Sequence, residues 1–165
     1  MTILNGLRQR KQNFGGITFS EIKYNIQMWS HYSNSHTGYC IGFKTKSFIL
    51  NDIYRFGQGN VVRYEQEFPI ILPTEDYFAQ ATTILYTKAK PWEYEQEYRL
   101  IKTGSANTVV SFTSDEVEEI IIGCSTNDSD TKSILNICKC NLRNIPVFKA
   151  KQKRLDFNLT FDRII

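Results

Sequence analysis

The run of isoleucines from Ile120 to Ile122, which ends at Gly123, constrains the fold of this chain more than any other feature. Uninterrupted apolar residues over so short a span are typical of a central, buried strand. Apolar residues at helical spacing follow over residues 128–141, and a strand-like segment follows at residues 146–151. We therefore expect residues 119–123 to form a central strand, followed by a helix and a further strand.

Two further helical patterns lie earlier in the chain. Ser20 is a candidate amino-terminal cap for a helix over residues 21–29, because Ile22, Ile26 and Trp29 recur on one face. Residues 75–88 predict a second helix, which Pro91 ends. The 128–141 helix is expected to bury one face, made of Ile134, Leu135, Ile137 and Cys138.

Strand-like segments separated by turn residues make up most of the remainder. They lie at residues 39–43, 61–64, 98–102, 109–112 and 155–161. In the last segment Leu155, Phe157, Leu159 and Phe161 alternate with polar residues. Residues Thr113–Glu116 have the spacing of a capping box and predict a single turn. The pattern predicts an α+β fold, with a mixed or antiparallel twisted sheet of about seven strands and about three helices.

Length and composition indicate an ordinary globular protein. The 165 residues correspond to one domain, and 41% hydrophobic with 22% charged residues exclude a disordered chain or a coiled coil. No apolar stretch approaches the ~20 residues of a membrane-spanning helix, and residues 1–13 lack the apolar core of a signal peptide. We therefore expect a cytoplasmic protein with no membrane partner. The aromatic fraction, 13%, is the unusual number.

The charge is mildly basic. A net charge of +3 and a pI near 8.6 fall short of a dedicated nucleic-acid-binding domain. The basic residues gather in two clusters, Arg8, Arg10 and Lys11 near the start and Lys149, Lys151, Lys153 and Arg154 near the end. These clusters either contact phosphates of a nucleic acid, if the fold brings them together, or form two solvated faces. Association into a homodimer is a further open alternative.

The cysteines do not form a metal-binding pattern. Cys138 and Cys140 are separated by one residue, whereas structural zinc sites use pairs with two to four spacers. Cys40 and Cys124 lie among apolar and glycine residues, which predicts buried free thiols. We therefore expect no metal.

The segment Met28–Gly38 combines polar and aromatic residues beyond what packing requires. It contains both histidines of the chain, His31 and His36, together with Trp29 and Tyr32. Histidines at the end of a helix interact favourably with its dipole, which is the structural interpretation. The alternative is a ligand-binding edge that offers imidazole groups and two aromatic rings.

The segment Lys88–Arg99 is the second concentration of such residues. In an extended chain Glu93, Glu95 and Glu97 would share one face, with Lys88, Lys90 and Arg99 available to compensate their charges. One interpretation is a solvated edge strand. The other is a carboxylate at the mouth of a cleft, oriented by Arg99 and framed by Trp92.

These motifs resemble a bacterial family known as domain of unknown function 2971. The resemblance rests on Met28-Trp29-Ser30-His31-Tyr32, His36-x-Gly38-Tyr39-Cys40-Ile41-Gly42-Phe43, Val62-x-Tyr64, Lys88-x₃-Trp92-x-Tyr94-Glu95-x-Glu97-Tyr98-Arg99 and Ile120-Ile121-Ile122-Gly123. It covers residues 14–150. Family members carry a further amino-terminal stretch, so the resemblance implies a single domain, residues 1–165, that corresponds to the carboxy-terminal two-thirds of the family.

A fold-level resemblance to ADP-ribosyltransferases concerns Glu97. In that class a glutamate that opens a late strand orients the nicotinamide ribose, which implies Glu97 as a catalytic carboxylate and NAD as the cofactor.

Two functional hypotheses follow. The favoured one is a binding or effector-associated module whose polar-aromatic site consists of Trp29, His31, Tyr32, His36, Trp92, Glu95 and Arg99. The alternative is an ADP-ribosyltransferase-like enzyme that acts on a nucleotide or nucleic acid through Glu97.

Overall fold

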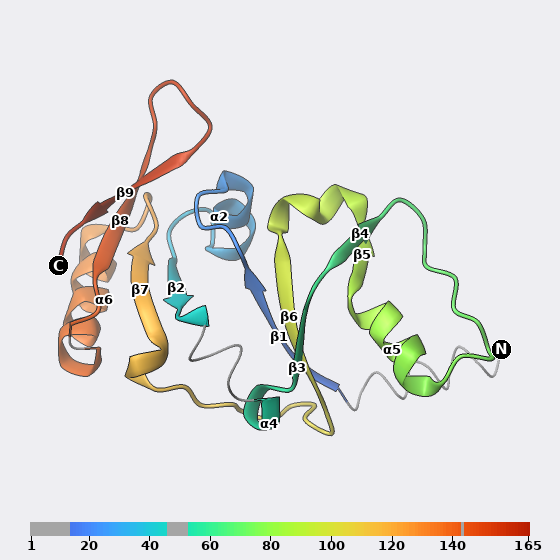
Figure 1. Ribbon diagram of the computed structural model, residues 1–165. Helices are drawn as coiled ribbons and strands as arrows, with labels where there is room; N and C mark the ends of the chain where they lie inside the picture. Colours follow the sequence, from blue (N-terminus) through green and yellow to red (C-terminus); the bar gives the residue numbers. More distant parts are fainter. Residues whose placement is uncertain (1–13, 46–52, 143) are drawn as a thin grey trace. The chain divides into compact units, whose positions relative to one another are not determined.

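The computed structural model describes residues 14–45, 53–142 and 144–165, which fall into two units (Figure 1). Unit 1 consists of residues Met1–Glu21 and Ile49–Val110, and unit 2 of residues Ile22–Phe48 and Ser111–Ile165. Each unit therefore combines two segments that are distant in the sequence. The expected organisation as one domain stays a prediction.

Unit 1 is built on a three-stranded antiparallel sheet in the order β1-β6-β3. Strands β4 and β5 form a separate, two-stranded parallel sheet. The strands are β1 (Phe14–Ser20), β3 (Gln58–Val61), β4 (Arg63–Glu65), β5 (Thr87–Ala89) and β6 (Glu97–Thr103). The helices are α4 (Ile53–Phe56), α5 (Tyr77–Leu85) and the 3₁₀-helix η1 (Lys90–Glu95).

The strand predicted at 98–102 is confirmed as β6, but its neighbours differ from the prediction. The segment 61–64 is divided between β3 and β4, because Val62 is buried and its N–H donates to the Glu97 carbonyl over 2.9 Å. The helix expected at 75–88 is shorter. Asp76 caps it by accepting two backbone N–H groups, and residues after Leu85 leave the helix to form β5. Pro91 lies in the first turn of η1, where its missing N–H costs nothing.

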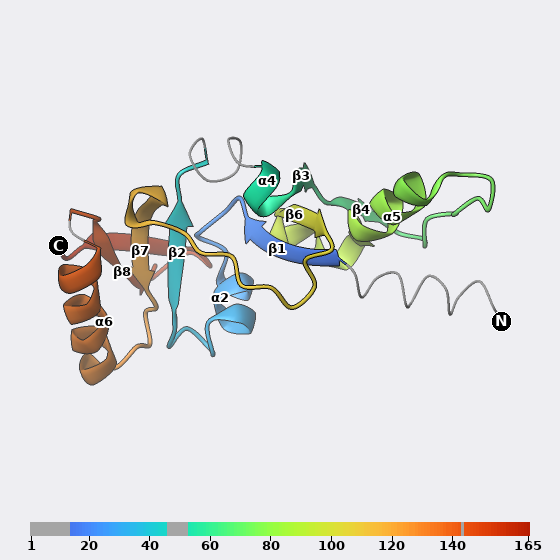
Figure 2. The ribbon, with the colours of Figure 1, turned by 90° about the horizontal axis from the view of Figure 1, so that it is seen from below.

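Unit 2 is built on a four-stranded sheet in the order β2-β7-β8-β9. Only the β7–β8 pair is parallel, and α6 connects these two strands. The strands are β2 (Tyr39–Phe43), β7 (Val117–Ile122), β8 (Val147–Gln152) and β9 (Leu159–Arg163). The helices are α2 (Ile26–Tyr32), α6 (Asp128–Asn141) and the single turn η2 (Ser114–Glu116). Figure 2 shows α6 running beside β7 and β8.

The isoleucine run occupies the central strand of this sheet, as predicted. Successive side chains of a strand point to opposite faces, so Ile120 and Ile122 pack with Cys138 of α6, while Ile121 packs with Trp29 of α2. All three isoleucines are buried. The run is continuous because a helix covers each face. The strands predicted at 39–43 and 146–151 and the capping box before η2 are also confirmed.

The helix predicted at 128–141 is confirmed with the same bounds, and Asn127 caps it. Ile134, Leu135 and Cys138 pack against the core, but Ile137 is exposed and the prediction for it is wrong. The helix predicted at 21–29 is displaced. Ser20 ends β1 opposite Glu97, and Asn25 is the actual cap, accepting the N–H groups of Gln27 and Met28. Pairing of β1 with β6 therefore overrides the local capping signal, and Ile22 lies outside the helix.

One predicted strand is wrong and another is confirmed only in its second part. Residues 109–112 have no strand partner among the described residues, and Val109 is exposed. The segment 155–161 becomes a strand only from Leu159, because its partner β8 ends at Gln152. Residues 153–158 form the connection instead, closed by a hydrogen bond from the Lys153 N–H to the Asn158 carbonyl. The α+β class is confirmed. None of the helices in the described part of the chain is long and apolar enough to cross a membrane.

Candidate functional site

The Lys88–Arg99 segment folds into η1 followed by β6 in unit 1, and not into one extended strand. Gln96, between the two elements, has a left-handed backbone with φ of 43°. This turn separates the three carboxylates, so the prediction that they share a face is wrong. Glu93 is exposed and pairs with Lys90, whereas Glu95 and Glu97 are 1% and 5% exposed.

Glu95, Glu97, Lys88 and Arg99 form a buried ion-pair network, which we call the η1–β6 network. The Lys88 ammonium donates to both Glu95 and Glu97. Arg99 Nε donates to the second oxygen of Glu97 over 2.7 Å. Lys88, Lys90 and Arg99 each compensate a carboxylate, as predicted. The interpretation as a solvated edge is wrong, because burying these charges requires the pairing that the structure shows.

Backbone contacts hold the η1–β6 network in place. The Glu97 N–H donates to the Tyr64 hydroxyl over 2.8 Å, and the Ser20 hydroxyl donates to the Glu95 carbonyl over 2.7 Å. Arg99 Nη1 donates to the carbonyl of Leu85, the last residue of α5, over 2.6 Å. The network therefore links β1, β4, α5 and β6. The resemblance motif contained Tyr64, but nothing in the local sequence indicated that Ser20 or Leu85 would support the carboxylates.

The environment determines the protonation state of this network. Burial raises the pKa of Glu97, but hydrogen bonds from Arg99 and Lys88 lower it more, to about 2. Burial lowers the pKa of Lys88, but its contacts with Glu95 and Glu97 raise it above its usual value. Near neutral pH, Glu97 is therefore a carboxylate and Lys88 an ammonium. Burial is also the main reason why the pKa of Tyr64 is raised.

Two aromatic rings lie next to the network on the surface of unit 1. The Lys88 Nζ lies 4.8 Å from the centroid of the Trp92 ring, within the range of a cation–π contact. The Trp92 and Tyr94 centroids are 6.1 Å apart. Trp92 remains 39% exposed. A cation of the η1–β6 network therefore contacts a partly exposed aromatic ring.

The Met28–Gly38 segment lies in unit 2. Trp29 is buried in the core, and its indole N–H donates to the Lys23 carbonyl over 2.7 Å. His31 and Tyr32 are exposed at the end of α2, with ring centroids 6.5 Å apart. The segment therefore divides into one core residue and an exposed pair.

The turn after α2 is unusual, because Asn34, Ser35 and His36 are all left-handed, with φ of 49°, 55° and 67°. The His36 carbonyl accepts the Ser125 N–H over 3.0 Å, which ties the turn to the residues that follow β7. A Cβ on Gly123 would lie 2.1 Å from this carbonyl oxygen, so the position requires glycine. The His36 Nδ1 atom is buried and has no hydrogen-bond partner among the residues that the structure describes.

The structure describes the second of the two basic clusters but not the first. Arg8, Arg10 and Lys11 lie outside the described residues. The Lys149 Nζ donates to the Thr126 carbonyl over 2.9 Å and to the Thr131 hydroxyl over 3.3 Å, so its ammonium is used inside unit 2. The remaining basic residues of the second cluster, Lys151, Lys153 and Arg154, are exposed.

The cysteines differ in part from the prediction. Cys138 is buried in the core, while Cys40 and Cys124 are only partly buried. Burial raises the pKa of the Cys40 thiol. Within residues 14–45, 53–142 and 144–165, no group of three or more His, Cys, Asp and Glu side chains could hold a metal ion.

Part of the chain matches the model of a known protein family. Residues 28–100 match a family model described as "Protein of unknown function (DUF2971)". The match supports the resemblance, over a shorter range than the expected residues 14–150. No curated protein and no solved structure matches the chain.

The region that matches DUF2971 contains every candidate site residue from Trp29 to Arg99. It takes residues from both units, because the part before Ile49 belongs to unit 2 and the part from Ile49 onward belongs to unit 1. The Ile120–Gly123 motif lies outside the DUF2971 match. Within unit 1 the structure brings Trp92, Glu95, Glu97 and Arg99 together, and within unit 2 it places Trp29, His31, Tyr32 and His36 on α2 and the turn after it.

Proposed function

We propose that the chain is a binding module, in which the η1–β6 network is a structural support and Trp92 is a ligand-contacting residue. The observation that supports this most directly is the engagement of Glu97. Its two carboxylate oxygens accept hydrogen bonds from Lys88 and Arg99, and its side chain is 5% exposed. Because both oxygens are already bonded and the side chain is buried, Glu97 is better placed to orient Lys88 and Arg99 than to contact a substrate.

The surroundings of Trp92 support its role in binding. Exposed tryptophan side chains offer a large, rigid apolar face at low entropic cost and are enriched at recognition surfaces. Here Lys88 lies against the ring, and Lys88 is itself held by two buried carboxylates. The ring is therefore oriented before a ligand arrives, which reduces the entropy lost on binding.

The second candidate function is an ADP-ribosyltransferase-like enzyme with NAD as the cofactor and a nucleotide or nucleic acid as the acceptor. One observation favours it: Glu97 is the first residue of β6, the position that the resemblance to that class implies. Its pKa of about 2 keeps it ionised, as a carboxylate that stabilises positive charge on a ribose must be.

The Glu97→Gln variant separates the two candidates. In a binding module, the wild-type chain does not consume NAD, with or without single-stranded DNA or RNA as acceptor. The variant removes the carboxylate that pairs with Arg99 and leaves Glu95 as the carboxylate paired with Lys88, and we expect a loss of about 3–5 kcal/mol in the free energy of unfolding. Chemical denaturation followed by circular dichroism measures this loss.

Glu93→Gln is the matched control, because Glu93 lies in the same segment and its ion pair with Lys90 is exposed. We expect it to change the free energy of unfolding by less than about 1 kcal/mol. NAD consumption by the wild-type chain that disappears in Glu97→Gln, with an unchanged unfolding midpoint, would establish the enzyme and reject the binding module.

A further inference from the structure

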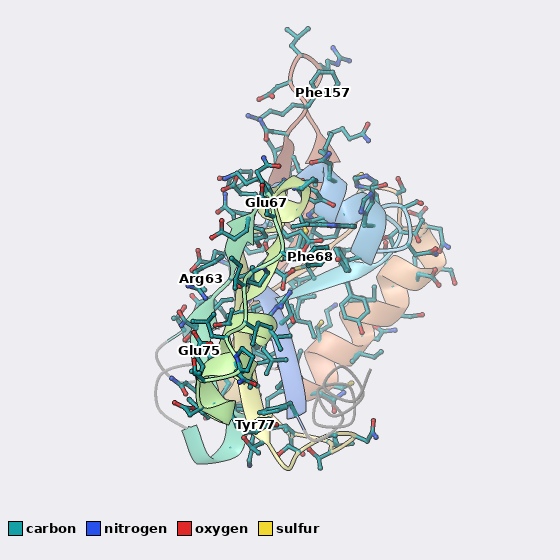
Figure 3. All side chains as sticks on the ribbon, turned by 90° about the vertical axis from the view of Figure 1, so that its right-hand side faces the viewer. Arg63, Glu67, Phe68, Glu75, Tyr77 and Phe157 are labelled. Atoms are coloured by element: carbon teal, nitrogen blue, oxygen red, sulfur yellow. The ribbon has the colours of Figure 1, made fainter. Side chains whose placement is uncertain are left out.

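The hairpin formed by β8 and β9 carries apolar side chains that the core does not use. Leu155 is 100% exposed and Phe157 is 88% exposed. Both lie in the connection between the strands, and Figure 3 shows Phe157 on this loop, beyond the ends of the strands. An exposed leucine and phenylalanine on one projecting loop indicate a contact surface.

The same hairpin carries a positive net charge. Residues 147–163 contain five basic side chains, Lys149, Lys151, Lys153, Arg154 and Arg163, and two acidic ones, Asp156 and Asp162. The hairpin therefore carries a formal charge of +3, equal to that of the whole chain. Residues 1–13 carry the same formal charge through Arg8, Arg10 and Lys11, and lie outside the described residues, so the hairpin is the basic region of the described part of the chain.

Several of these cations are available to a partner. Lys151 pairs with Asp162 over 2.5 Å and Lys153 with Asp156 over 3.3 Å, but both pairs are exposed. Exposed pairs contribute only about 0–1 kcal/mol and exchange readily for another anion. Arg154 is exposed on the same loop.

Within unit 2, residues of this loop line a groove together with Ile26, the first residue of α2, and His36, in the turn after α2. Its volume is about 460 Å³, in the range of small-ligand sites of about 300–1,000 Å³. Ile26 and His36 line one side, and the hairpin side includes Lys153, Arg154, Phe157 and Asn158. The groove thus combines cationic, aromatic and amide groups with the side chain of His36.

We propose that this hairpin and groove bind single-stranded nucleic acid. Arg154, Lys151 and Lys153 contact the phosphates, and Phe157 stacks on a base. Single-strand binding sites combine a positively charged groove with exposed aromatic side chains, because every base has an apolar face that can stack. The hairpin is separate from the η1–β6 network, so this inference does not depend on the function proposed for unit 1.

An anionic membrane is the other surface that attracts basic and apolar side chains. The hairpin fits it less well, because Asp156 lies between Leu155 and Phe157 and would enter the bilayer with them. The hydrogen bond from the Asn158 side chain to Asp156 also keeps polar groups at this position. The amide and imidazole groups of the groove can form hydrogen bonds with the edge of a base.

The test is fluorescence anisotropy of the full chain with labelled oligo-dT and oligo-U of about 15 nucleotides, at 50 and 200 mM NaCl. We expect Phe157→Ala to weaken binding about 5- to 150-fold, since stacking on one base contributes about 1–3 kcal/mol. We expect Arg154→Ala to reduce the slope of log K against log salt by about 0.7, the value for one phosphate contact on a single strand.

The matched controls are Phe68→Ala and Arg63→Ala. Phe68 is 98% exposed and Arg63 is exposed, and both belong to unit 1. Both controls should bind like the wild-type chain. Absence of oligonucleotide binding by the wild-type chain, or equal weakening by Phe157→Ala and Phe68→Ala, would overturn the proposal. Cosedimentation with phosphatidylserine vesicles that depends on Phe157, without oligonucleotide binding, would assign the surface to membranes instead.

Discussion

The central strands of the two units are buried by different chemistry. In unit 2, β7 presents Ile120, Ile121 and Ile122 to apolar cores on both faces. In unit 1, β6 buries Leu100, but its first residue is the ionised Glu97, within a network of two carboxylates and two cations. Unit 2 therefore relies on packing, whereas unit 1 relies in addition on the pairing of buried charges.

The comparison shows how a buried strand can serve two purposes. Apolar packing is independent of direction and of pH, and it supplies stability without placing a group for recognition. The η1–β6 network is costly to bury, but it fixes the positions of Lys88 and Trp92. Unit 1 should therefore be the more sensitive of the two to charge removal and acid, and unit 2 to the removal of apolar volume.

Lys88→Met should have the largest effect. The substitution leaves Glu95 and Glu97 buried with Arg99 as the remaining cation of the network, and we expect a loss of about 3–5 kcal/mol in the free energy of unfolding. Urea denaturation measures it. The control is Lys90→Met, because the Lys90–Glu93 pair is exposed and should contribute about 0–1 kcal/mol. Equal effects of the two substitutions would mean that the network does not support unit 1.

Ile121→Ala should have a somewhat smaller effect, in unit 2. Ile121 is fully buried between Trp29 and its neighbours, so the substitution removes apolar area and leaves a cavity, at a cost of about 2–5 kcal/mol. Ile137→Ala on the exposed side of α6 should change stability by less than about 0.5 kcal/mol. The cost of Ile121→Ala should be the same at pH 7 and pH 3. A cost that varies strongly with pH would contradict the contrast between the units.

Mild acidification should have the smallest effect of the three on stability. It should unfold unit 1 before unit 2. The pKa of Glu97 is about 2 in the folded chain against 4.5 for an unperturbed glutamate, so its contribution to stability is complete above pH 4.5 and is lost as the pH falls towards 2. The chain has two tryptophans, Trp29 in unit 2 and Trp92 in unit 1. Labelling with 5-fluorotryptophan therefore gives one ¹⁹F resonance for each unit.

We expect the Trp92 resonance to report acid unfolding at a higher pH than the Trp29 resonance. The Glu97→Gln variant should lack this pH dependence, because its amide does not titrate. Simultaneous loss of both resonances in the wild-type chain, or earlier loss of the Trp29 resonance, would show that the buried charges do not set the acid sensitivity of unit 1.

Much of the fold of unit 2 could be predicted because its signals are local. The isoleucine run, the 128–141 helix and the capping box each depend on residues close in sequence, and each is confirmed. The predictions failed where pairing decided the structure. Ser20 resembles a helix cap but pairs with β6, and the alternating residues from Leu155 lack a strand partner before Leu159.

The sequence by itself determined the α+β class, the buried central strand and the presence of cations near the three carboxylates. Only the tertiary structure decided which carboxylates are buried, because the left-handed turn at Gln96 separates exposed Glu93 from buried Glu95 and Glu97. It also decided that Phe157 is exposed, although the alternation from Leu155 to Phe161 predicted a strand. The physical reason is the same in both cases: burial depends on partners distant in the chain, which local spacing does not specify.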